Sequence, residues 1–94
     1  MPTIGVLTLE LILRDAHSLK DKRHVVKSLK DRLRSRFNVA VAEIDYQDLW
    51  QRALVAAVTV ASDHGPAEQV LQSVEREAAA LLGPGLAGVT VEWL

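Results

Sequence analysis

The chain has 94 residues, 49% of them hydrophobic, which predicts one domain over residues 1–94 and leaves too few residues for a second core. It has no cysteine, which excludes disulfides and thiolate metal sites, and its apolar runs are too short to cross a membrane. The net charge of −1 conceals a polarised chain, because nine of the eleven Lys and Arg residues lie in residues 14–36 beside only three acids. We therefore expect a cytoplasmic protein with an anion-binding surface.

The first half of the chain predicts a strand, a helix and a second strand. In residues 4–14 every second residue from Leu7 on is leucine, which indicates a strand with one buried face. The opposite face is also partly apolar, so we expect another surface to cover it; Trp50 or Trp93 is expected to help line this face. Residues 19–36 predict a helix capped by Ser18, whose apolar stripe follows steps of three and four: Val26, Leu29, Leu33 and Phe37.

The second half predicts two further strands around another helix. Residues 39–44 and 49–62 alternate or are β-branched, and they should pair antiparallel across an acidic turn. A helix follows, with Pro66 at its first position, and Gly83-Pro84-Gly85 ends it before a strand at 89–93. The order βαββαβ predicts an α+β, ferredoxin-like sandwich in which two helices cover one face of a four-stranded antiparallel sheet.

The basic residues of the first predicted helix fall along one line. At 100° per residue, Lys20, Lys27, Lys30 and Arg34 all lie within about 60° of Arg23, beside the apolar stripe. The sequence places no acid in this line, whereas a solvated helix face usually mixes charges at i, i+4 spacing. Both a solvated face and an anion-binding surface are compatible with the pattern. In the second case Arg14, Lys22 and Arg36 lie at its margins.

The connection before this helix offers a second place for an anion. Arg14 and His17 stand next to the helix N-terminus, whose free N–H groups favour negative charge. Together with the first cations of the helix they could surround a phosphate. A flexible loop with solvated charges is the alternative.

Other kinds of site lack their signatures. The three histidines have no metal-ligand spacing, so we expect neither a metal nor a cofactor. The acids Glu43, Asp45 and Asp48 cluster around the second strand, where a solvated turn or a partner for the basic helix is the simpler interpretation than catalysis. Phosphate-binding glycine loops, serine-esterase motifs and the aromatic segment of an RNA-recognition motif are all missing. The chain is therefore expected not to be an enzyme.

Three segments stand out by their sequence: SLKDKR at 18–23, RLRSRFNVAVAE at 32–43 and WQRA at 50–53. They resemble the YlxP-like family, small bacterial proteins of unassigned function. The resemblance spans nearly the whole chain and implies a ferredoxin-like fold. Members are often encoded beside transcription-elongation, translation-initiation and ribosome-maturation factors, which implies a role near RNA or the ribosome. The family supplies no catalytic site, and its basic motif corresponds to Lys20, Lys22 and Arg23.

Two functional hypotheses follow from the sequence. The first is a non-enzymatic protein that contacts RNA or a ribosomal particle through the phosphates. The second is a protein-interaction module or homodimer that uses the uncovered sheet face, or a strand edge formed by residues 91–94, while the basic helix docks an acidic partner.

Overall fold

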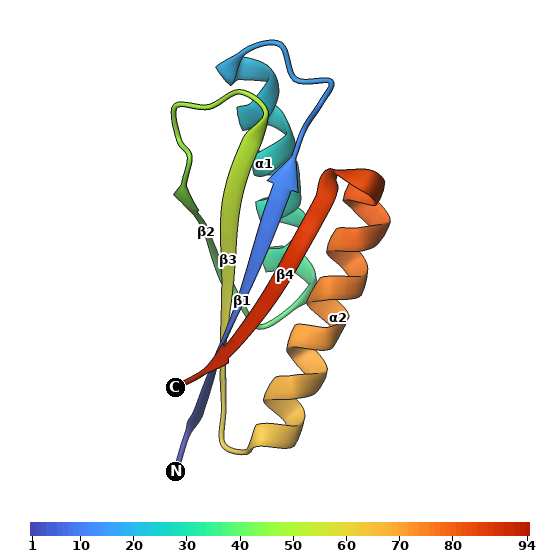
Figure 1. Cartoon of the computed structure of the whole chain (residues 1–94). Helices are drawn as coiled ribbons and strands as arrows, with labels where there is room; N and C mark the ends of the chain where they lie inside the picture. The colour runs from blue at the N-terminus through green and yellow to red at the C-terminus, as the bar shows by residue number, and fades with distance from the viewer.

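A computed structural model describes all 94 residues, and it confirms the ferredoxin-like α+β fold. The elements in chain order are β1 (Thr3–Ile12), α1 (Leu19–Arg36), β2 (Ala40–Asp45), β3 (Arg52–Ala61), α2 (His64–Leu82), a 3₁₀ turn η1 (Gly83–Gly85) and β4 (Leu86–Trp93). The sheet is antiparallel in the order β2-β3-β1-β4, and both helices lie on one side of it (Figure 1). The edges of the sheet are therefore β2 and β4.

The core lies between the sheet and the two helices. In β1 the predicted alternation holds, because Leu7, Leu9 and Leu11 are fully buried and face inward. Leu9 pairs with Val55 of β3, so both central strands present apolar side chains to the helices. The helices complete the cluster with six residues: Val26, Leu29 and Leu33 from α1, and Leu71, Val74 and Ala78 from α2.

The start of α1 is fixed by two hydrogen bonds of Asp21. Ser18 Oγ accepts from the backbone N–H of Asp21 at 3.1 Å, as the sequence predicted for a cap. The Asp21 carboxylate in turn accepts from the backbone N–H of His17 at 2.9 Å. This arrangement is a variant of the capping box, in which the Asp at the third helical position bonds the residue before the N-cap instead of the N-cap itself; the bond to Ser18 satisfies one backbone donor that the helix leaves unpaired.

Trp93 lies on the inner face of the sheet, so the prediction that it helps line the outer face is wrong. Its strand partner is Gly5, and a Cβ on Gly5 would stand 2.5 Å from the Trp93 ring and 2.7 Å from Leu71 of α2. The ring therefore fills the space that a side chain at Gly5 would need. The other partner is His64 at the start of α2, whose ring centroid lies 4.2 Å from that of Trp93.

Several predicted boundaries are wrong by a few residues. β1 ends at Ile12, two residues before the predicted end. β3 begins at Arg52, because residues 46–51 form a turn instead of extending the strand. Tyr46 begins this turn with φ 64°, and Leu49 N donates to its carbonyl at 3.0 Å. α2 begins at His64, two residues before Pro66, since the first turn of a helix does not need the N–H that proline lacks. β2 and β4 likewise end or begin a few residues from the expected positions.

Candidate anion-binding surface on helix α1

The five cations predicted to form a line lie along one flank of α1, and we call them the basic ridge: Lys20, Arg23, Lys27, Lys30 and Arg34. The stripe of α1 that contains Val26, Leu29 and Leu33 is buried against the sheet. About 140–180° from Arg23, the helix faces α2, where Arg32 and Arg36 both contact Glu77 Oε1 at 3.0 Å. The basic ridge is on the remaining flank, away from α2.

Four of the five ridge cations have no partner within the protein. Lys20, Arg23 and Arg34 are exposed and Lys30 is half-buried, and none of their side chains takes part in an ion pair or a hydrogen bond. By contrast, the cations elsewhere in the chain are mostly engaged: Arg52, for example, contacts Glu10 at 3.1 Å. The free positive charge of the molecule is therefore concentrated on this flank.

Lys27 is the exception, and it corrects the expectation that the basic ridge contains no acid. Its Nζ lies 2.7 Å from Asp31 Oδ2, one helical turn further on. The hydrogen bond from Lys27 holds the pKa of the Asp31 carboxyl below its usual range, with further help from the positive charges of Lys27, Arg34 and Lys30. Both side chains are exposed, at 78% and 54%, so the pair is weak and an incoming phosphate could replace it.

Lys22 cannot contact an external anion, and the prediction that includes it in the binding surface is wrong. Its side chain is only 1% exposed, and its Nζ donates to three backbone carbonyls: Tyr46 O at 2.6 Å, Gln47 O at 3.2 Å and Arg52 O at 3.2 Å. Since an ammonium has three N–H groups, these bonds use all of them. Glu43 Oε2, 2.9 Å from Nζ, is buried and accepts no well-directed hydrogen bond, so its contact with Lys22 is an attraction of charges.

The burial of Lys22 has a signal in the sequence that its charge concealed. Lys22 stands four residues before Val26, and it therefore continues the apolar stripe of the helix toward its start. Its partner Glu43 lies on the same face of the strand as Val39 and Val41, which pack against the core. A lysine and a glutamate that both occupy core-facing positions predict a buried pair, because neither ion is stable there alone.

Arg36 is placed differently from the prediction, which made it a margin of the basic surface. Together with Arg32 it contacts Glu77, and so joins α1 to α2 on the flank opposite the basic ridge. Its side chain is 56% exposed, and this ion pair is on the surface. Arg36 therefore contributes to the packing of the helices and not to the continuous line of free cations.

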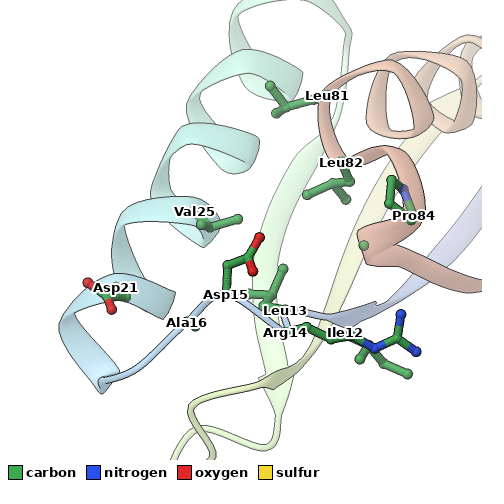
Figure 2. Close-up of a pocket in the computed structure, with 11 residues that line it drawn as sticks. Ile12, Leu13, Arg14, Asp15, Ala16, Asp21, Val25, Leu81, Leu82 and Pro84 are labelled. Atoms are coloured by element: carbon green, nitrogen blue, oxygen red, sulfur yellow. The ribbon is translucent and has the colours of Figure 1, made fainter.

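Arg14 and the connection before α1 border a hollow of about 480 Å³, which lies between the start of α1 and the end of α2. Figure 2 shows Asp15 pointing into the space between α1 and Leu82, whereas the guanidinium of Arg14 points away from α1. Asp21 also lines the hollow, and its wall is largely apolar. Two carboxylates disfavour a phosphate, so this hollow is a poorer anion site than the basic ridge.

The acids that sequence analysis grouped around β2 do not assemble into one site. Glu43 faces inward to Lys22, while Asp45 Oδ1 accepts from the N–H of Tyr46 at 2.8 Å and Asp48 is exposed. Nowhere in the chain do three His, Asp or Glu side chains lie close enough to hold a metal ion. His64 instead contacts Glu68 at 3.0 Å.

Neither helix contains an apolar stretch long enough to cross a membrane. The fold and the surface together define a ferredoxin-like domain with one basic helix flank. Residues 4–83 match the family described as a protein of unknown function, DUF503, and the chain belongs to that family. The uncharacterized protein YlxP of Bacillus subtilis (strain 168) is 44% identical over 71 residues, which are 76% of this chain and 77% of that protein. The predicted resemblance to the YlxP-like family is confirmed.

Solved structures with the same fold have little sequence in common with the chain. The de novo designed protein Foldit4 is 13% identical with a TM-score of 0.61, over 100% of this chain and 97% of the design. A dimeric ferredoxin-like protein of unknown function from Thermobifida fusca YX is 18% identical with a TM-score of 0.51, over 97% and 90%. A cofactor-independent oxygenase from Streptomyces nogalater also shares the fold. The fold alone therefore does not distinguish a binding protein from an enzyme.

Proposed function

We propose that the chain is a non-enzymatic, cytoplasmic protein that contacts RNA or a ribosomal particle through phosphates bound to the basic ridge. One observation carries the proposal: four cations without partners, Lys20, Arg23, Lys30 and Arg34, line the flank of α1 that faces away from α2. Like charges at such spacings repel one another unless an anion lies between them.

The dimensions of the basic ridge suit a nucleic-acid backbone. From Lys20 to Arg34 the helix rises about 21 Å, at 1.5 Å per residue. This length is enough for several successive phosphates of one strand, which are a few ångströms apart. The helix is held in place by its buried stripe and its capping box, so the cations are presented on a rigid support.

The salt dependence of RNA binding tests this proposal. Five phosphate contacts predict a slope of log K against log salt of roughly −3.5 for a single strand. Arg23→Glu should weaken binding strongly and flatten the slope, whereas Arg76→Glu changes the net charge equally on α2 and should have little effect. A slope near zero for the wild type, or equal losses in the two variants, would contradict a phosphate surface on α1.

A second candidate function is self-association through the outer face of the sheet. There Val58 and Val60 of β3 are 36% and 54% exposed beside the half-buried Ile4 and Val6 of β1, which makes a continuous apolar strip across the two central strands. We infer that a second copy of the chain covers this strip, as an isologous dimer would. Sedimentation at micromolar concentration should give a dimer, and Val60→Lys should convert it to a monomer; a monomeric wild type would contradict the inference.

A further inference from the structure

Among the aromatic residues of the chain, Trp50 alone lacks a partner. Phe37 packs against the core, and the ring of Tyr46 is covered by the guanidinium of Arg52, whose Cζ lies 4.3 Å from the ring centroid. Trp93 packs on His64. Trp50, in contrast, is 53% exposed, next to Leu49 at 46%. A large aromatic side chain left in solvent on a small domain is a mark of a binding surface.

The loop that carries Trp50 is anchored at both ends. At its start the Lys22 ammonium binds the carbonyls of Tyr46 and Gln47, and at its end it binds the carbonyl of Arg52. The side chain of Gln51 adds two bonds, since its Nε2 donates at 3.1 Å to the carbonyls of Arg14 and Ala16. The backbone around Trp50 is therefore fixed before any ligand arrives, which lowers the entropic cost of binding.

The same contacts place the loop that carries Trp50 at the end of the molecule where the basic ridge begins. Lys22 reaches the loop from the first turns of α1, where its neighbours Lys20 and Arg23 begin the basic ridge. Figure 1 shows the β2–β3 loop and the start of α1 at the same end of the molecule. An elongated ligand that follows the basic ridge toward the N-terminus of α1 therefore comes to the loop with Trp50.

The charges of the loop indicate which part of such a ligand it receives. Asp45 and Asp48 stand in or next to the loop, and Asp48 is exposed, so a phosphate is disfavoured there. An uncharged, flat base is not disfavoured by these carboxylates. Aromatic stacking of a base is available only where the base is unpaired, because a duplex hides its faces.

We propose that Trp50 is a stacking platform for an unpaired base, and that the RNA bound by the basic ridge is single-stranded at the N-terminal end of α1. This inference rests on the proposed function and narrows its ligand from RNA in general to a single strand or a splayed loop. The cations supply affinity for the backbone, and Trp50 supplies the preference for an unpaired base.

The test measures binding of a 12-nucleotide oligouridylate and of a blunt RNA duplex to a Trp93→Phe protein, whose single tryptophan is Trp50. We expect the single strand to quench the fluorescence of Trp50 and the duplex to leave it unchanged. Trp50→Ala should weaken single-strand binding by about 5- to 150-fold, in line with 1–3 kcal/mol per stacked base. The salt slope should stay the same, because no phosphate contact is lost, while Trp50→Phe should keep most of the affinity.

The outcomes separate this inference from the function on which it rests. If the wild type binds RNA and Arg23→Glu abolishes binding but Trp50→Ala does not weaken it, the basic ridge binds RNA and the stacking platform is wrong. The inference is also wrong if Trp50→Leu binds as tightly as Trp50→Phe. If the wild type binds neither RNA, the proposed function and the inference fail together. Because Trp50 is exposed, thermal melts of its variants should match the wild type.

Discussion

Replacing Lys22 with methionine should destabilise the protein severely, although lysine substitutions on a helix surface are usually harmless. The change leaves three backbone carbonyls without their donor and the Glu43 carboxylate, which is 18% exposed, without its counter-ion. Removing one partner of a buried ion pair costs about 3–5 kcal/mol. A domain of this size has a free energy of unfolding of only about 5–15 kcal/mol, so Lys22→Met should lower Tm by roughly 12 °C or more.

Urea unfolding of matched variants checks this prediction. Lys20→Met removes a cation of the same type two residues earlier, at an exposed position, and should change the free energy of unfolding by no more than about 0.5 kcal/mol. The double variant Lys22→Met/Glu43→Leu should regain part of the loss, because it removes the unpaired carboxylate but not the unpaired carbonyls. A loss below about 1 kcal/mol for Lys22→Met, or an equal loss for Lys20→Met, would refute the conclusion that the buried contacts of Lys22 stabilise the fold.

Three further substitutions test Asp31 beside the basic ridge, the inner face of the sheet and the cap of α1. Asp31→Asn should tighten RNA binding and leave the salt slope near that of the wild type, since Lys27 no longer has to leave Asp31 to contact a phosphate, whereas Asp63→Asn on another part of the chain should not; equal effects would point to net charge alone. Because the pKa of Asp31 is lowered, its contribution to stability is present above the unfolded pKa and is lost as pH falls through the folded value, so Asp31→Asn should flatten acid unfolding. Gly5→Ala should cost about 1–3 kcal/mol in urea unfolding by displacing Trp93, and an unchanged midpoint would contradict this. Ser18→Ala should cost about 1 kcal/mol, and a loss of helix signal on mild heating would report it.

The fold was predictable because the patterns that define it are local. Leucine at every second position of β1 and the three- and four-residue steps of α1 each report one buried face, and the element order then leaves few topologies. The prediction failed where backbone groups bind distant partners. The turn at residues 46–51 is held by hydrogen bonds of Lys22 and Gln51 to residues far away in the sequence. No local pattern could therefore have predicted that β3 begins at Arg52.

The candidate site was predictable in part, for a related reason. Helical spacing located the five cations of the basic ridge, because that calculation needs only the 100° rotation per residue. It did not reveal Asp31 as the partner of Lys27, although the i, i+4 spacing is visible in the sequence. The prediction placed Trp93 on the wrong face, although Trp93 is four residues after Val89 and therefore on the same face of the strand; Val89 packs on the core, which already indicates the inner side.

Under the proposed function, the segment Ser18–Arg23 has two roles, carried by side chains on different sides of the same helical turn. Lys20 and Arg23 face solvent and begin the basic ridge, while Lys22 lies about 100° from Arg23 and points into the protein, where it fixes the loop that carries Trp50. Substitution of Lys22 should therefore disturb binding indirectly, by loosening the loop, and leave the salt slope unchanged. Substitution of Lys20 should reduce the magnitude of that slope by about 0.7 at full stability. Slope and stability together thus distinguish the cation that binds from the cation that holds the binding surface in place.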